Sequence, residues 1–285
     1  MKRLAVLFCA IIATGATSVA AQASCASMAE CPAVVLPRTT ARQEATIAGI
    51  NALLGGATAA IYRLAHGQSP WRAFWEGTVG GGLIYAGKRV AVEPFDGAGL
   101  AGREVASMGG SMIRNASAGR GLLDRLVLPL GPVRLYVGGG PVRARLDLAT
   151  VLMSAAFIGA YDARLDPAAS LSAGALIFRA RTPMPGETAA GVMALWDDMP
   201  ASEGPRLMAH ERVHILQYDQ AFLSWGQPLE RWALDHGWAD AFFRYVDLGG
   251  GALAIRSGAA LVFAYQSRPW EREAYFLAQR VYPLH

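Results

Sequence analysis

Two histidines and a glutamate near residue 210 have the types and the spacing of a zinc site. The segment reads His210-Glu211-Arg212-Val213-His214, which is the pattern HExxH. On a helix, residues four apart lie about 40° apart around the axis, so both imidazoles can reach one Zn²⁺. Glu211 is turned by about 100° from His210, where its carboxylate can meet a water without being a ligand. The motif therefore predicts Zn²⁺ as the cofactor, His210 and His214 as ligands, and Glu211 as the proton acceptor in a hydrolysis.

A zinc site needs a third protein ligand, and a helical segment near the C-terminus offers two glutamates. Glu271 and Glu273 flank an apolar stripe on opposite sides, so periodicity alone does not choose between them. Glu271 shares its side with alanine and tyrosine, whereas Glu273 faces Arg280, which we expect to be its partner at the surface. We therefore favour Glu271 as the ligand, 57 residues after His214, and keep Glu273 as the alternative.

Together these residues resemble the gluzincin family of zinc metallopeptidases, and in particular small bacterial members with HExxHxxQ, here His210 to Gln217. The resemblance covers roughly residues 170–285. It implies peptide-bond hydrolysis and a glutamate ligand on a later helix, a position that Glu271 matches. It also implies a sheet whose edge strand pairs with the substrate backbone, and residues 174–181 occupy the expected place.

Two positions depart from the family pattern. Arg212 places a charge where these peptidases usually have an uncharged residue, and Tyr275 stands where an aspartate is expected. Both departures motivate a second interpretation, a non-catalytic envelope protein stabilised by zinc. A third interpretation is a membrane protein in which the HExxH pattern is accidental.

The residue that stabilises the transition state has no motif of its own. Tyr265 precedes the segment with Glu271 and is a candidate donor to an oxyanion, with a plain core position as the alternative. His236 is a second candidate for the same task, or for a third ligand should neither glutamate serve.

The elements that must position this site follow from hydrophobic periodicity. Residues 133–137 and 142–148 alternate between apolar and polar side chains around a Gly-rich turn, which predicts a β-hairpin. We expect an apolar helix over residues 149–161, a strand over 174–181, and mainly helix from residue 201 onward. The expected fold is therefore α+β, with a small antiparallel β-sheet in the middle and a helical, zincin-like C-terminal part that carries HExxH.

The N-terminal half is rich in glycine and alanine and is expected to be helical. Residues 45–62 carry no charge, residues 73–87 carry only Glu76, and residues 97–116 are more polar. Small residues at such spacing let helices approach closely. Two interpretations remain open: close packing of helices within the fold, which we favour, and a helical hairpin against or inside a membrane.

Composition limits the class of protein. Only 17% of the 285 residues are charged, and the mean hydropathy is +0.26, which excludes intrinsic disorder. The net charge is +4, but the arginines are scattered and form no run, so no nucleic-acid partner is expected. The expected partners are a peptide or protein substrate and, through the Gly-rich half, a membrane.

The first residues have the pattern of an export signal. A short basic start precedes an apolar run over residues 4–13, and the small-x-small sequence at 21–23 predicts cleavage near Ala23. Export to an oxidising compartment then favours a disulfide between Cys25 and Cys31. We expect an exported protein of a bacterial periplasm or envelope, with a signal peptide (1–23), a linker (24–44), a Gly-rich helical region (45–124) and a β-sheet plus metallopeptidase-type domain (125–285).

Overall fold

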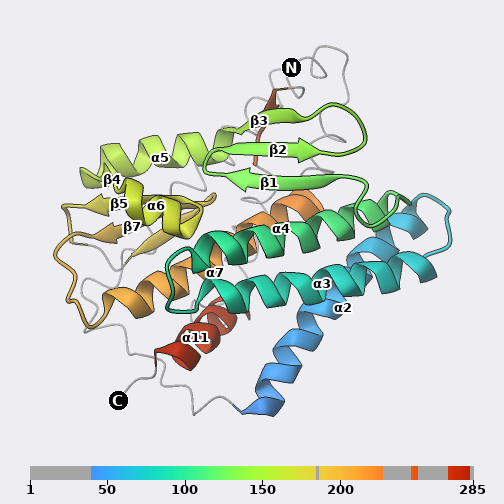
Figure 1. The fold of residues 1–285 in the computed structure, drawn as a ribbon, viewed down its shortest axis with the longest axis horizontal. Coiled ribbons are helices and arrows are strands. Elements are labelled where there is room, and N and C mark those ends of the chain that lie inside the picture. The colour runs from blue at the N-terminus through green and yellow to red at the C-terminus, as the bar shows by residue number, and fades with distance from the viewer. Residues whose placement is uncertain (1–39, 184–185, 227–244, 250–268, 283–285) are drawn as a thin grey trace, which may run out of the picture.

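The computed structural model describes residues 40–183, 186–226, 245–249 and 269–282. Within them the N-terminal half forms long helices that run back and forth beside one another (Figure 1). These are α2 (Ala41–Ala65), α3 (Trp71–Ala91) and α4 (Ala98–Ser117). Helix α2 starts at residue 41, so the last residues of the expected linker are already helical.

Glycines allow these helices to pack at close range, with α3 between α2 and α4. A Cβ placed on Gly80 of α3 would lie 2.6 Å from the carbonyl oxygen of Gly109 on α4. A Cβ on Gly81 would lie 2.8 Å from the Cα of Ala52 on α2. The prediction that the small residues serve close helix packing is therefore confirmed for these contacts.

Two four-stranded sheets cover the helical layer and complete an α+β fold, which confirms the predicted class. The predicted hairpin is present as β2 and β3, which pair antiparallel with Val133 opposite Leu146. Each sheet also contains one parallel pair, β3 with β8 and β5 with β7, so the sheets are mixed rather than one antiparallel sheet. The first has the order β1 (Leu126–Leu130), β2 (Val133–Val137), β3 (Arg143–Asp147), β8 (Val246–Asp247), and the second β4 (Arg164–Leu165), β5 (Leu176–Ala180), β7 (Val192–Trp196), β6 (Glu187–Ala189).

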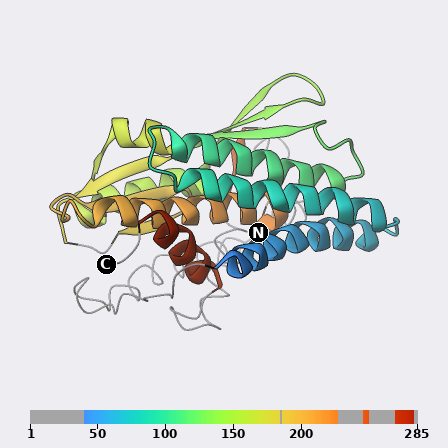
Figure 2. The same cartoon turned by 60° about the horizontal axis from the view of Figure 1, so that its bottom comes forward.

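Helix α7 (Gly204–Ala221), which carries HExxH, lies at the centre of the molecule. It contacts α3 and α4 on one side and α11 (Pro269–Val281) on another, and strands β6 and β7 approach it as well (Figure 2). The apolar helix predicted over 149–161 is α5 (Leu148–Tyr161), whose first turn is capped by the carboxylate of Asp147. A short helix, α6 (Pro167–Ala173), joins β4 to β5.

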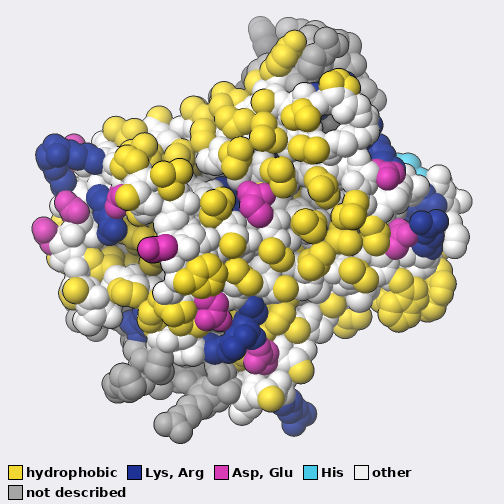
Figure 3. Space-filling view, viewed as in Figure 1, with side chains coloured by type: hydrophobic (Ala, Val, Ile, Leu, Met, Phe, Trp, Pro, Cys, Tyr) yellow, Lys and Arg dark blue, Asp and Glu magenta, His cyan; other side chains and the backbone are white. Residues whose placement is uncertain are grey.

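One face of the molecule is largely apolar. Hydrophobic side chains cover much of the face shown in Figure 3, with few charges between them. Large side chains are exposed on α2, α3 and α5 in particular, and several of them keep more than half of their surface accessible to solvent.

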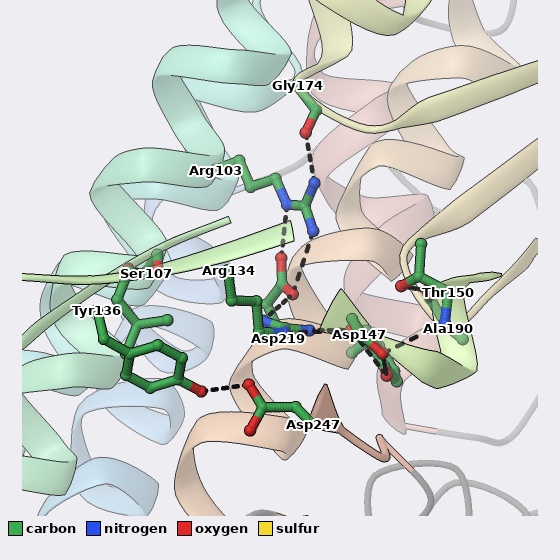
Figure 4. A network of polar contacts seen from close by, with 12 residues as sticks. Arg103, Ser107, Arg134, Tyr136, Asp147, Thr150, Gly174, Ala190, Asp219 and Asp247 are labelled. Atoms are coloured by element: carbon green, nitrogen blue, oxygen red, sulfur yellow. Dashed lines mark hydrogen bonds and ion pairs between the residues drawn. The ribbon is translucent and has the colours of Figure 1, made fainter. Parts of the chain in front are cut away.

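Buried ion pairs join the helical half to the first sheet and to α7 (Figure 4). Asp219 of α7 accepts from Arg103 of α4 at 2.7 Å and lies 3.1 Å from Arg134 of β2. Arg134 also donates to Asp147 at 2.6 Å. Burial opposes ionisation of Asp219, but the two arginines hold its pKa below the ordinary value. These contacts fix the position of α7 within the fold.

Candidate metal centre

The structure brings His210, His214 and Glu271 together in a buried cluster. The two histidines lie one turn apart on α7, and their Nε2 atoms are 3.0 Å apart. Helix α11 contributes Glu271, whose Oε2 lies 3.1 Å from His214 Nε2 and 3.4 Å from His210 Nε2. Three candidate ligands from two helices therefore converge on one point.

The spacing of these atoms fits a zinc ion. Tetrahedral coordination with bonds of about 2.0–2.1 Å puts ligand atoms roughly 3.3 Å apart, close to the three distances in the cluster. Burial opposes ionisation of Glu271, but His214 and His210 beside it hold its pKa well below the ordinary value. The carboxylate is therefore available as an anionic ligand. This donor set, two imidazoles and one carboxylate, is one that Zn²⁺ takes in hydrolytic sites.

The two histidines are supported in different ways. His214 Nδ1 lies 2.7 Å from Gln217 Oε1, which holds the imidazole from the side opposite to the cluster. The ring of His210 packs against the ring of Tyr275, with centroids 4.3 Å apart. Its Nδ1 has no hydrogen-bond partner among the residues that the structure describes. Tyr275, at the position where the resemblance to the gluzincins predicts an aspartate, packs against this ring instead.

Glu211 is buried beside the cluster and is held by a residue that the sequence did not reveal. The hydroxyl of Thr188 on β6 donates to Glu211 Oε2 at 2.6 Å. Thr188 is a single threonine in a short strand, and no motif marks it. The contact places the carboxylate of the HExxH glutamate next to the edge of the second sheet.

The prediction that residues 174–181 form the edge strand for substrate is wrong. They form a strand, β5, but it lies between β4 and β7, so neighbours occupy both of its edges. Strand β6 is at the edge instead, and it also contacts α7. A two-residue turn at Ala190 and Gly191, both with positive φ, joins β6 to β7. Ala190 is an unusual residue in such a turn, so the hairpin carried no clear sequence signal.

The expected surface pair of Glu273 with Arg280 is also wrong. Glu273 is largely buried and accepts from Lys88 at 2.9 Å, Asn51 at 2.7 Å and Gln217 at 2.8 Å. Burial opposes its ionisation, but Lys88 holds its pKa below the ordinary value. Periodicity on its own helix could not reveal a partner that comes from α3. The signal available was that Lys88 is the only lysine besides Lys2.

Arg212, the unusual charge within the motif, points away from the cluster. Its guanidinium donates to the carbonyl of Ala91, the last residue of α3, at 3.3 Å. Burial lowers its pKa. A cation at the carboxyl end of a helix stabilises the free carbonyls there. Arg212 therefore serves the packing of α7 on α3 and does not enter the metal site.

Several predicted features lie outside the described residues. They are the candidate oxyanion donors Tyr265 and His236, the signal segment with its cleavage point near Ala23, and the pair Cys25 and Cys31. These remain predictions.

Comparison with known proteins assigns the chain to no family. No family model matches it, and neither a curated protein nor a solved structure matches it.

Proposed function

We propose that this chain is an exported, zinc-dependent peptidase of the gluzincin type. The observation that carries the proposal is the convergence of His210, His214 and Glu271 beside a buried Glu211. The spacing of the three donor atoms supports zinc as the ion, and the position of the HExxH glutamate supports hydrolysis.

Each of these residues has its own role in the proposed hydrolysis. His210, His214 and Glu271 would hold Zn²⁺, which as a Lewis acid would lower the pKa of a water to about 7. Glu211 accepts a proton from the attacking water and delivers it to the leaving amine, so that the C–N bond breaks without forming an unstable anion. Thr188 fixes the carboxylate of Glu211 during both transfers, because its hydroxyl holds one of the two oxygens.

The edge of the second sheet is the proposed place for the substrate backbone. Strand β6 pairs only with β7 among the described strands, so its other edge offers backbone donors and acceptors. An extended peptide can add to such an edge as a further strand. Thr188 of β6 contacts Glu211, so a peptide bound there lies close to the metal cluster.

Metal analysis and hydrolysis of a peptide library test the proposal. The mature chain is expected to bind one zinc ion and to cleave peptides. Glu211→Gln is expected to keep the zinc and to lose at least about a hundredfold in rate, because the proton acceptor is gone. Glu203→Gln, at the start of the same helix, is the matched control and should keep both. Full hydrolysis by Glu211→Gln would show that the proposed mechanism is wrong.

The third ligand is tested separately. Glu271→Ala is expected to abolish stoichiometric zinc, because two histidines leave the ion with too few protein ligands. Stoichiometric zinc in this variant would place the third ligand elsewhere, with His236 the next candidate.

The Nδ1 atom of His210 favours a second candidate function, a zinc-stabilised envelope protein without catalysis. A ligating histidine usually donates its other N–H to a carboxylate or carbonyl, and no residue in the described part of the chain accepts such a bond from His210. Bound zinc, a fold that melts earlier with chelator and no cleavage of any peptide would identify this function. Metal-free purified protein that melts at the same temperature after zinc addition would rule out both functions.

We further propose that the exposed face of α2 rests on a membrane. This helix is the described one that is long and apolar enough to span a bilayer, but its other face packs on α3 through Asn51, Gly55 and Ala59. The packed face makes contact with a lipid surface a better fit than a span. Trp71 and Trp75 are exposed at the start of α3, and tryptophan is favoured at the interface between lipid and water. The exposed face itself is aliphatic and comprises Ile50, Leu53, Leu54, Ile61 and Leu64.

A further inference from the structure

The hydrogen bonds around Gln217 determine which nitrogen of His214 carries the proton. The side-chain nitrogen of Gln217 donates to the carbonyl of Trp270 at 3.0 Å and to Glu273 Oε2 at 2.8 Å. Both partners are acceptors, so the NH₂ end of the amide must face them. The amide oxygen then faces His214 and lies 2.7 Å from Nδ1. An amide oxygen can only accept, so Nδ1 of His214 carries a hydrogen.

This tautomer is the one that a metal site on Nε2 requires. With the proton on Nδ1, the Nε2 lone pair of His214 points toward His210 Nε2 and Glu271 Oε2, at 3.0 and 3.1 Å. The opposite tautomer would place a hydrogen where the ion has to bind. The orientation of one amide therefore decides whether His214 is ready to ligate.

Residues of the Gly-rich helices fix that orientation in turn. Lys88 of α3 has three acceptors, Glu273 Oε2 at 2.9 Å, Asn51 Oδ1 at 2.9 Å and Gln220 Oε1 at 3.0 Å. An ammonium group has three donors in a compact arrangement, which suits this set better than the planar fork of arginine. Asn51 of α2 also donates to the other oxygen of Glu273 at 2.7 Å. Both oxygens of Glu273 are thus held, and one of them faces Gln217.

We propose that Gln217 is a positioning residue that holds His214 in its Nδ1-protonated form, and that Glu273 and Lys88 fix the direction of its amide. The helical half of the chain thereby takes part in the metal site without contacting the ion. The inference rests on the proposed zinc site, but the tautomer of His214 can be measured without metal.

Gln217→Met and Gln220→Met form the first test, because the same substitution is made one turn apart on α7. Both glutamines belong to the polar cluster around Lys88 and Glu273, but only Gln217 contacts His214. In metal-free protein labelled with ¹⁵N-histidine, at a pH at which the imidazole is neutral, NMR should show His214 protonated on Nδ1 and not on Nε2 in the wild type and in Gln220→Met. Gln217→Met should lose this preference and bind zinc about 10- to 100-fold more weakly, whereas Gln220→Met should stay within about threefold.

The opposite results overturn the inference. Protonation of neutral His214 on Nε2 in the wild type would do so, as would equal zinc affinities in the two methionine variants. A wild type that binds no zinc contradicts the proposed function, while its tautomer still tests the inference. A wild type that binds zinc and cleaves peptides but has Nε2 protonated in the metal-free form contradicts the inference alone.

An exchange of the two side chains tests the part played by Glu273. Gln217→Glu alone places two carboxylates at contact distance and should weaken zinc binding more than tenfold. Adding Glu273→Gln restores one amide and one carboxylate in exchanged places, so the double variant should bind zinc at least tenfold more tightly than Gln217→Met. This second comparison holds even where Gln217→Glu alone fails to fold. A double variant no better than Gln217→Met would overturn the role of Glu273.

Discussion

Glu211 is positioned by a neutral hydroxyl and has no cation beside it among the described residues. Thr188 donates to one carboxylate oxygen, and both residues are buried. A lysine or arginine in the same place would stabilise the carboxylate and make it a poorer proton acceptor. A hydroxyl fixes the direction of the group at a smaller electrostatic cost. This arrangement suits a residue that must accept a proton and release it again.

Thr188→Val keeps the shape of the side chain and removes this donor. We expect zinc content to stay the same and kcat to fall about tenfold, because Glu211 can then turn away from the productive direction. Thr150→Val is the control, since Thr150 is a buried threonine that bonds Ala190 away from the metal cluster. Metal analysis and steady-state kinetics of both variants provide the measurement. Unchanged kcat in Thr188→Val would show that the hydroxyl does not position the base.

The sequence predicts the site residues that follow a fixed helical spacing. It does not predict contacts with residues from distant parts of the chain. His210, Glu211 and His214 were identified because helical geometry alone places them together. Glu271 was favoured over Glu273 from the apolar neighbours on its own helix, but the other ground, a surface pair of Glu273 with Arg280, was wrong. The partner of Glu273 could not be predicted, because Lys88 lies 185 positions earlier in the chain and no local pattern relates the two.

The close packing of α2, α3 and α4 explains why glycine is concentrated in the first half of the chain. Helix α3 has to approach α2 and α4 closely enough for Lys88 to reach Glu273 on α11. Two adjacent glycines of α3 differ sharply in their surroundings. Gly81 faces the backbone of Asn51 and Ala52, while nothing lies within 4 Å of a Cβ on Gly82.

Gly81→Ala and Gly82→Ala are therefore expected to have opposite effects. The first should lower the free energy of unfolding by about 1–3 kcal/mol, because a methyl group meets backbone that cannot yield. The second should raise it by about 0.5–1 kcal/mol, because alanine costs less backbone entropy in a helix. Urea denaturation of both variants measures the difference. Equal effects would mean that α2 and α3 do not pack as described.

Helix α4 carries a carboxylate that weakens the fold at high pH. Both oxygens of Glu104 are buried without a hydrogen-bond partner among the described residues. Burial raises its pKa to about 7, with Arg103 acting against this and Asp219 adding to it. A carboxyl group with a raised pKa in the folded state favours folding while protonated, and this stability is lost as the pH rises through about 7.

Glu104→Gln is therefore expected to raise the Tm at pH 8 and to leave it nearly unchanged at pH 4. At pH 4 the wild-type side chain is already neutral in the folded state, so the substitution changes little. Calorimetry at the two pH values gives the comparison. The same shift of Tm at both would show that the effect of the substitution is not electrostatic.

At the level of elements, periodicity predicted the β2–β3 hairpin, the strand at β5 and the apolar helix α5, and the structure confirms them. It did not predict how the strands are ordered. The parallel pairing of β5 with β7 depends on β7 entering between β5 and β6, and this order comes from tertiary packing rather than from local alternation.

The whole molecule is held together across its two halves by buried charges. Arg103 from the helical half and Arg134 from the first sheet share Asp219 of α7 (Figure 4). Breaking a buried pair of this kind costs about 3–5 kcal/mol, because the remaining charge stays buried. Together with the ion pair of Lys88 and Glu273, these pairs join the Gly-rich half to α7 and α11, the two helices that carry the candidate metal ligands. None of these pairs involves the outer face of α2.

We expect the exposed face of α2 to bind a membrane. Leu53 and Ile61 lie two turns apart on the exposed side of α2, and each keeps more than half of its surface accessible. Full burial of one such side chain contributes about 1.5–3 kcal/mol. The double variant Leu53→Glu/Ile61→Glu is therefore expected to lower binding to phosphatidylcholine–phosphatidylglycerol vesicles at least tenfold in a flotation assay, without lowering the Tm.

The control for this experiment is Leu152→Glu/Leu171→Glu, which adds the same charge to exposed leucines of α5 and α6. If α2 is the membrane face, the control should bind vesicles within about threefold of the wild type, because only the α2 leucine and isoleucine leave water on binding. Equal losses in the two double variants would assign the effect to net charge. A wild type that does not float with vesicles would contradict the proposed membrane contact. The proposed zinc site would not be affected by this result.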